Sequence, residues 1–176
     1  MKVYAVRHGQ VDSNFKKIHN VSNDEDINET GIKQAESLRD RIKDMDFDIV
    51  YVSPYLRARH TAEIINSKNI KTVIDDRLRE RSAGDLRGKP LDSTDREEYW
   101  NYYTKIKYGT EESMQNLFER VANFLDELKE KDYESVLVVA HRGVSRAFYA
   151  YFNGIPEDGK MLNLGLNNCE IKEYEL

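Results

Sequence analysis

The sequence predicts an α/β fold in which helices cover both faces of a mostly parallel central sheet. Two observations lead to this prediction. Three short runs of β-branched and aliphatic residues are typical of buried strands, and they span Val3 to Val6, Asp48 to Val52 and Val136 to Ala140. Helical periodicity fills the intervals between them, and strands that alternate with helices form parallel sheets with two covered faces.

The first helix is expected from Thr30, a candidate N-cap, to about Asp44. The residues that share one face of it are Ile32, Ala35, Leu38, Arg39 and Ile42. A second helix is expected to hold Pro54 in its first turn, where proline is favoured, and to run to about Asn66.

A third helix is indicated by an apolar stripe, with Ser113 or Thr110 as its cap. The stripe consists of Met114, Leu117, Val121, Phe124, Leu125 and Leu128. A fourth helix begins near Gly143 and ends at the breaker sequence Asn153-Gly154-Ile155-Pro156. Weaker strand candidates are Lys71 to Ile74 and Asn168 to Tyr174, and no element is assigned to residues 84–109.

The composition favours one globular domain that spans residues 1–176. Hydrophobic residues make up 39% of the chain and charged residues 34%, so a polar surface and a genuine core are both expected. The formal net charge of -5 argues against a broad nucleic-acid surface, which needs clustered Lys and Arg. Any recognition of phosphate is therefore expected to be local.

Cys169 is the only cysteine, which excludes an intramolecular disulfide and a structural zinc site of several thiolates. We expect a protein of the reducing cytoplasm. No stretch approaches ~20 apolar residues, and the apolar run after Met1-Lys2 is too short for a signal-peptide core, so no membrane association is expected. The sequence leaves the oligomeric state open.

Polar sequences follow the three strongest strands. They are Arg7-His8-Gly9, Ser53-Pro54-Tyr55-Leu56-Arg57 and His141-Arg142-Gly143. Ligands of parallel sheets bind at the carboxyl ends of the strands, so these sequences are expected to meet there. The planar guanidinium groups of Arg7 and Arg57 suit the oxygens of a phosphate monoester.

His8 is the candidate nucleophile, because a cationic neighbourhood keeps an imidazole neutral and able to attack phosphorus. Gly9 would let the backbone approach the phosphate, and His141 could donate a hydrogen bond to its oxygens. Glu80 is the candidate acid for the leaving alkoxide. Each residue alone has an ordinary structural explanation, and their shared place at one sheet edge is what favours catalysis. Two further histidines, His19 and His60, are assigned structural roles.

Longer motifs occur in a fixed order along the chain. They are Arg7-His8-Gly9-Gln10 with Asn14, Glu29-Thr30-Gly31-Ile32-Lys33-Gln34-Ala35, Ser53-Pro54-Tyr55-Leu56-Arg57-Ala58 with Thr61-Ala62, Leu78-Arg79-Glu80 with Gly84 and Gly88, Glu112-Ser113 with Arg120-Val121, and Val138-Val139-Ala140-His141. With this combination the chain resembles the histidine phosphatase superfamily, also called phosphoglycerate mutase-like, over essentially its whole length.

The resemblance implies a three-layer α/β/α sandwich that needs neither a metal nor an organic cofactor. It also implies roles for individual residues. His8 becomes phosphohistidine, Glu80 donates the proton, and the phosphate is surrounded by Arg7, Asn14, Arg57 and His141.

The chain departs from the family pattern at Arg142, where glycine is more usual. The backbone amide of Arg142 can still contact phosphate. Its long cationic side chain either favours an acidic substrate, or it points to solvent or pairs with a surface carboxylate.

We expect a phosphomonoester hydrolase whose only partner is a small phosphorylated substrate. Mutases of the family carry longer insertions over the active site than residues 84–109 provide, so hydrolysis is favoured over transfer. A phosphoglycerate mutase and, more specifically, an α-ribazole phosphatase are the alternatives. The presence of all expected catalytic residues argues against a third one, a non-catalytic phosphate-binding regulator.

An aromatic cluster consists of Tyr99, Trp100, Tyr102 and Tyr103. It is either a lid over the leaving group or ordinary helix packing, since helical spacing places only some of its members on one face. The nearby cations are Arg87, Lys89 and Lys105.

Overall fold

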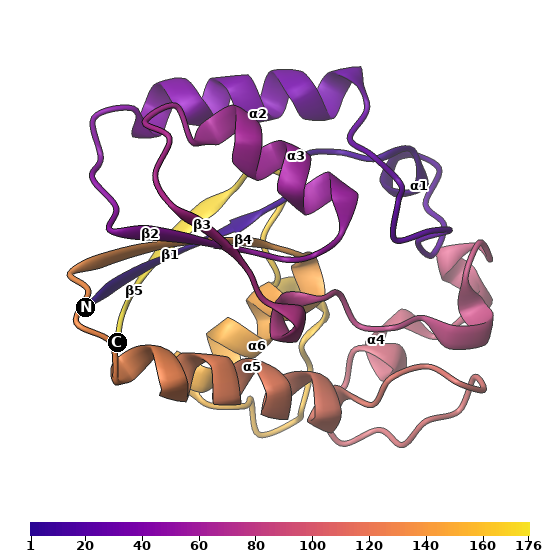
Figure 1. Cartoon of the computed structure of the whole chain (residues 1–176). Coiled ribbons are helices and arrows are strands. Elements are labelled where there is room, and N and C mark those ends of the chain that lie inside the picture. Colours follow the sequence, from indigo (N-terminus) through magenta and orange to yellow (C-terminus); the bar gives the residue numbers. More distant parts are fainter.

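The computed structural model describes all 176 residues and contains one five-stranded sheet with the strand order β3-β2-β4-β1-β5 (Figure 1). The strands are β1 (Lys2–Arg7), β2 (Ile49–Val52), β3 (Thr72–Ile74), β4 (Ser135–Ala140) and β5 (Ile171–Glu175). All neighbouring strands are parallel except β1 and β5. The predicted mostly parallel sheet is therefore confirmed, including its two weaker strands.

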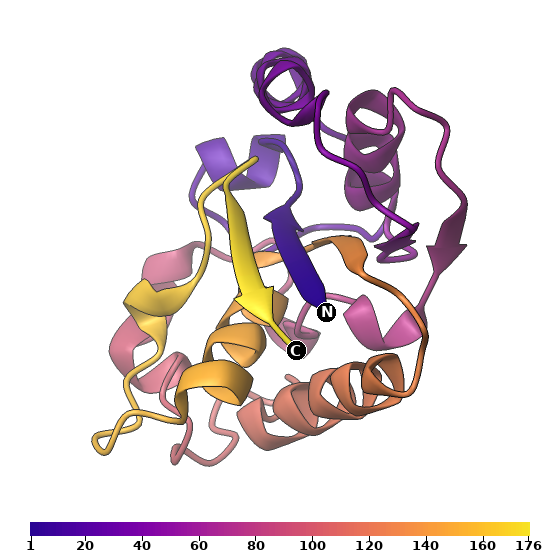
Figure 2. The same ribbon diagram turned by 90° about the vertical axis from the view of Figure 1, so that its left-hand side faces the viewer.

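Two pairs of helices cover the sheet: α2 and α3 lie on one face, and α5 and α6 lie on the other (Figure 1). The helices are α1 (Asp12–Phe15), α2 (Glu29–Ile42), α3 (Leu56–Ile65), α4 (Arg96–Tyr99), α5 (Met114–Lys129) and α6 (Arg142–Asn153). Figure 2, turned by a quarter, shows the same two layers on either side of the strands. The three-layer α/β/α sandwich is thus confirmed. None of these helices has the length and apolar composition needed to cross a bilayer.

The central strand β4 contributes to two separate hydrophobic cores. Val136 and Val138 face the larger core beneath α5 and α6, while Leu137 and Val139 face the smaller core beneath α2 and α3. Side chains of a strand alternate between the faces of a sheet, so a strand covered on both faces needs apolar residues at every position. This burial explains why the run from Val136 to Ala140 is continuously apolar.

The starts of two helices differ from the predictions. The N-cap of α2 is Asn28, whose side chain accepts the amide of Gly31 at 2.9 Å, so the prediction of Thr30 as the cap was wrong. Pro54 precedes the first turn of α3 rather than lying in it. There the hydroxyl of Ser53 accepts the amide of Tyr55 at 3.3 Å, and this turn delays the helix. Of the two candidate caps for α5, Ser113 is the correct one.

The carboxyl ends of β1, β2 and β4 open toward α1 and α4, at the edge of the sheet opposite the two chain termini (Figure 1). Residues 84–109, to which the sequence assigned no element, form two turns of 3₁₀ helix followed by α4. They lie against the same edge of the sheet. The topology therefore leaves this edge as the place where the polar sequences gather.

Two glycines fix the approach of α2 to the loop after β1. A Cβ atom on Gly9 would lie 2.5 Å from the carbonyl oxygen of Gly31, and one on Gly31 would lie 2.9 Å from the Cβ atom of Ile27. We expect Gly31→Ala to lower the free energy of unfolding by about 1–3 kcal/mol, because the backbone must shift. Urea denaturation checks this, with Ser37→Ala on the exposed face of α2 as the control. Equal stability of the two variants would contradict the expectation.

Candidate active site

Four predicted site residues gather at the carboxyl edge of the sheet. Arg7 ends β1 and His8 follows it, Arg57 lies in the first turn of α3, and His141 joins β4 to α6. All four are buried, with exposed fractions of 7% or less. The ring centroids of His8 and His141 are 5.1 Å apart. Residues that are distant in sequence thus form one cluster.

The hydrogen bond of His8 determines which ring nitrogen carries its proton. Nδ1 lies 2.7 Å from the carbonyl oxygen of Gly9, and a carbonyl can only accept, so Nδ1 is the protonated nitrogen. Burial, reinforced by Arg57 and Arg7, holds the pKa of His8 well below its usual value of 6.5. The ring is therefore neutral and keeps a free lone pair on Nε2.

His141 is arranged to offer a hydrogen-bond donor. Its Nε2 lies 2.7 Å from the hydroxyl oxygen of Ser53, which already accepts the amide of Tyr55. The Ser53 hydroxyl is thus available to donate to Nε2, which places the ring proton on Nδ1. That Nδ1 atom is buried and has no protein partner. A buried donor without a partner is costly, and the oxygen of a bound phosphate would satisfy it.

Arg7 and Arg57 are buried cations without a carboxylate partner. Arg7 donates to the carbonyl of Leu166 at 3.2 Å and Arg57 to that of Ser22 at 3.2 Å, and the Nε atom of each has no partner. Burial lowers the pKa of Arg7 to about 10, so Arg7 stays protonated near neutral pH. Two unpaired guanidinium groups favour a dianionic ligand at this place.

Glu80 is held by backbone amides rather than by cations. The amide of Gly143 donates to both carboxyl oxygens, at 3.0 and 3.1 Å, and the amide of Arg81 donates to Oε1 at 2.8 Å. A Cβ atom on Gly143 would collide with Oε1 of Glu80. Glycine at this position therefore allows the carboxyl group to lie against the start of α6.

The loop that carries Glu80 is fixed by Arg120 of α5. Arg120 donates to the carbonyl oxygens of Arg77 at 2.6 Å, Arg79 at 2.8 Å and Glu80 at 3.3 Å. Both carboxyl oxygens of Glu112 accept from Arg120 at 2.8 Å. One ion pair thus positions three carbonyl groups of the loop.

Asn14, the further predicted phosphate contact, lies beside the backbone of His8. Its Oδ1 atom accepts from Nδ2 of Asn168 at 3.3 Å, and Asn168 also donates to the carbonyl oxygen of His8 at 2.9 Å. This orientation leaves the Nδ2 group of Asn14 as a donor toward the site.

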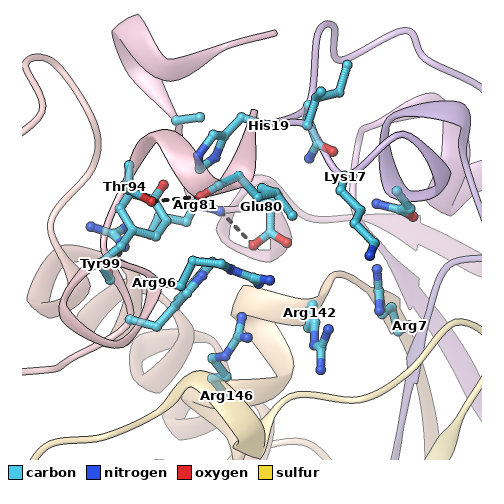
Figure 3. A pocket seen from close by; sticks show the side chains of 16 residues that line it. Arg7, Lys17, His19, Glu80, Arg81, Thr94, Arg96, Tyr99, Arg142 and Arg146 are labelled. Atoms are coloured by element: carbon cyan, nitrogen blue, oxygen red, sulfur yellow. Dashed lines mark hydrogen bonds between the residues drawn. The ribbon is translucent and has the colours of Figure 1, made fainter. Parts of the chain in front are cut away.

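A cavity of about 330 Å³ borders this cluster at Arg7 (Figure 3). A volume of this size suits a small molecule. Of the predicted site residues, Arg7, Asn14, Glu80 and Arg142 line it, whereas His8, Arg57 and His141 do not. Residues 84–109 supply part of its wall through Leu91, Thr94, Arg96, Tyr99 and Trp100.

The side chain of Arg142 lies in the wall of this cavity and forms no ion pair. The alternative that it pairs with a surface carboxylate was therefore wrong. The reason is its place at the first position of α6, which directs it toward the carboxyl edge of the sheet. Its Nε atom is buried and has no partner.

The two histidines that were assigned structural roles differ. His60 pairs with Asp26 at 2.9 Å, outside the cavity. His19, in contrast, lines the cavity, and its buried Nε2 atom has no partner. Its sequence neighbourhood carries no motif, so sequence reasoning missed this position.

The aromatic cluster is divided between the cavity and its surroundings. Tyr99 and Trp100 line the cavity, whereas Tyr102 packs on Phe118 with a centroid distance of 5.3 Å and Tyr103 is exposed. Of the nearby cations, Arg87 borders a smaller neighbouring pocket, and Lys89 and Lys105 line neither. The lid hypothesis is thus restricted to Tyr99 and Trp100.

Sequence reasoning missed four further cations of the cavity, which are Lys17, Arg81, Arg96 and Arg146. Lys17 lies in the loop after α1 and Arg96 in the single turn of α4, and no apolar periodicity reveals either position. Arg146 was detectable, because it follows Arg142 by one helical turn and must share its face of α6.

Stability should fall as the pH drops below about 6.5. The folded-state pKa values of His8 and His141 lie well below those of the unfolded chain, so only the unfolded chain gains these protons. Their contribution is present above pH 6.5 and is lost toward the folded-state pKa, by up to roughly 1.4 kcal/mol per pH unit for each histidine. Urea titrations at neutral and acidic pH measure this slope. A double His8→Gln, His141→Gln variant with an equally steep slope would refute it.

A family model described as the histidine phosphatase superfamily, branch 1, matches residues 3–176. The phosphatase PhoE of Bacillus subtilis, named as uncharacterized, is 32% identical over 97% of this chain and 89% of that protein. The 2,3-bisphosphoglycerate-dependent phosphoglycerate mutase of Cytophaga hutchinsonii is 32% identical over 96% and 85%. The crystal structure of the alpha-ribazole phosphatase from Shigella flexneri matches with a TM-score of 0.84 at 25% identity, over 100% of this chain and 91% of that one.

Proposed function

Because the chain belongs to branch 1 of the histidine phosphatase superfamily, we propose that it hydrolyses small phosphate monoesters through a phosphohistidine formed at His8. One observation carries this proposal. The neutral His8 ring keeps its free Nε2 atom in a cluster with two buried arginines, Arg7 and Arg57, that have no anionic partner. A candidate nucleophile thus lies beside two cations that can bind a dianion.

In the first step, Nε2 of His8 attacks phosphorus and forms an N–P bond while the P–O bond to the alcohol breaks. Arg7 and Arg57 neutralise the phosphoryl oxygens, and the Nδ1–H group of His141 donates to one of them. Glu80 enters this step protonated and gives its proton to the leaving alkoxide. The alcohol leaves and Glu80 remains as a carboxylate.

In the second step, the Glu80 carboxylate accepts a proton from a water molecule as the water oxygen attacks phosphorus. The N–P bond breaks, its electron pair returns to Nε2, and inorganic phosphate is released. His8 is again neutral and Glu80 again protonated, so the cycle closes without an additional reactant. The hydrogen bond to Gly9 keeps the ring in one tautomer throughout.

The proposed chemistry requires no metal ion. We expect p-nitrophenyl phosphate to be hydrolysed at the same rate before and after prolonged treatment with a chelator, because cationic side chains take the place of a metal at the phosphoryl oxygens. Release of p-nitrophenolate measures this, and restoration by added Mg²⁺, Mn²⁺ or Zn²⁺ is tested in parallel. Loss on chelation that a divalent cation reverses would point to a metal enzyme instead.

A phosphoglycerate mutase is the second candidate, because a relative that bears this name is 32% identical to the chain. A mutase must retain a bisphosphorylated intermediate, and the cavity wall that residues 84–109 supply consists only of short 3₁₀ turns and the single turn of α4. The assay is conversion of 3-phosphoglycerate primed by 2,3-bisphosphoglycerate. Isomerisation that outruns phosphate release would reverse the order of the two candidates.

A further inference from the structure

The cavity over the site carries far more positive charge than one phosphate group requires. One carboxylate lines it, that of Glu80, against six cationic side chains, which are Arg7, Lys17, Arg81, Arg96, Arg142 and Arg146. None of the six forms a salt bridge. A phosphate monoester brings at most about two negative charges, which Arg7 and Arg57 already balance. Further anionic charge is needed to satisfy the remaining cations.

Arg146 is held rigidly in the cavity wall. It is 1% exposed, and it donates to the carbonyl oxygens of Met161 at 2.8 Å and Leu162 at 2.7 Å. Its guanidinium carbon lies 3.8 Å from the ring centroid of Trp100. The Nη1 atom is buried without any partner. A fixed guanidinium with an unsatisfied donor is suited to bind an anion.

Arg142 lies one helical turn before Arg146, so the two side chains share a face of α6. Its Nε atom is also buried without a partner. Burial, followed by the charge of Arg142, lowers the pKa of Arg146 to about 9, and Arg96 contributes in the same direction. These cations repel one another, and a bound anion would relieve the repulsion.

Figure 3 shows Arg7, Arg96, Arg142 and Arg146 along one side of the cavity, across from Glu80. Arg96 comes from α4, whereas Arg142 and Arg146 come from α6. The fold therefore brings together arginines from two helices that are distant in sequence. Arg81 is already engaged, since it donates to the carbonyl oxygens of Glu112 and Tyr99. Arg142 and Arg146 each keep a buried nitrogen atom without a partner, and Arg96 forms no ion pair, so these three arginines can still bind a ligand.

We propose that Arg96, Arg142 and Arg146 form a second anion site, which selects phosphate monoesters whose alcohol carries another anionic group. This inference rests on the proposed function and names its substrate class. The anionic group is a carboxylate or a second phosphate, because both match the planar fork of a guanidinium. Arg142 lines the cavity and its buried Nε atom has no partner, so it is one of the residues expected to give this chain its preference.

The test compares ligands that differ in the second anionic group. O-Phosphoserine is paired with O-phosphoethanolamine, and fructose 1,6-bisphosphate with fructose 6-phosphate. Calorimetry measures their binding to the His8→Ala protein, which cannot consume them. We expect the more anionic member of at least one pair to bind roughly ten- to a hundredfold more tightly, as hydrogen bonds to charged groups imply. Whether the first or the second pair shows the preference distinguishes carboxylate from phosphate.

Arg142→Gln and Arg96→Gln, each placed in the His8→Ala protein, are expected to reduce that preference at least about fivefold. Arg39→Gln, on a partly exposed part of α2 where the arginine pairs with Asp40, is the control outside the cavity and should retain it. Equal binding within both pairs, or a preference that both Gln variants preserve, would overturn the second anion site. Arg96→Gln keeps the test decisive if Arg142→Gln fails to fold.

The outcomes separate this inference from the proposed function. If the protein hydrolyses p-nitrophenyl phosphate but binds both members of each pair equally, the proposed function stands and the second anion site is refuted. If it binds the more anionic members selectively but hydrolyses nothing, the proposed function is refuted and the second anion site stands.

Discussion

Replacement of His8 by alanine is expected to lower kcat/KM for p-nitrophenyl phosphate by roughly 10⁴-fold or more, as removal of a covalent nucleophile does in other enzymes. The nucleophilic lone pair on Nε2 has no substitute nearby, because the neighbouring His141 is bonded through its own Nε2 to Ser53. Steady-state kinetics measure the loss. Alkaline quenching of the wild type during turnover, followed by mass spectrometry, should locate the phosphoryl group on His8.

The matched control is His60→Ala, which removes an imidazole that pairs with Asp26 outside the cavity. It should retain activity close to that of the wild type. Residual activity within tenfold of wild type in His8→Ala, or a phosphoryl group trapped on another residue, would contradict the assignment of the nucleophile.

Replacement of Arg57 by methionine is expected to separate activity from stability. We expect kcat/KM to fall by roughly 10³-fold, comparable to the loss of an arginine that stabilises a transferring phosphoryl group. The free energy of unfolding should stay the same or rise, because Arg57 is 1% exposed and has no carboxylate partner to offset its desolvation. The only hydrogen bond that the variant loses is the one from Arg57 to the carbonyl oxygen of Ser22.

Kinetics and urea denaturation of the same preparations check both parts of this expectation. Arg59→Met, two residues along α3 and outside the cavity, is the control. A parallel loss of activity and stability in Arg57→Met would instead indicate that the guanidinium supports the fold.

The sheet was predictable because its central strands are buried on both faces. β1, β2 and β4 are therefore continuous apolar runs, and the polar residue that follows each run marks the carboxyl edge. Arg7, His8, Arg57 and His141 were identified in this way. Their roles in catalysis remain predictions, which the variants above test for His8 and Arg57.

The cavity wall was not predictable in the same way. Residues 84–109 have no apolar periodicity, since short 3₁₀ turns and the single turn of α4 bury few side chains each. The position of Arg96 depends on this irregular path, and Lys17 lies in the loop after α1, whose backbone accepts the amide of Leu91. The partners of the site residues, such as Ser53 for His141, depend on tertiary distances of a few ångströms that no spacing along the chain encodes.

The hydrogen bonds from Arg120 to the loop that carries Glu80 affect the entropy of the reaction. By binding the carbonyl groups of Arg77, Arg79 and Glu80, one guanidinium removes most of the freedom of the segment that carries the proposed proton donor. This ordering takes place during folding, so it need not recur in each catalytic cycle. Glu112 and Arg120 thereby help to hold the carboxyl group of Glu80 in place, although neither of them contacts that carboxyl group.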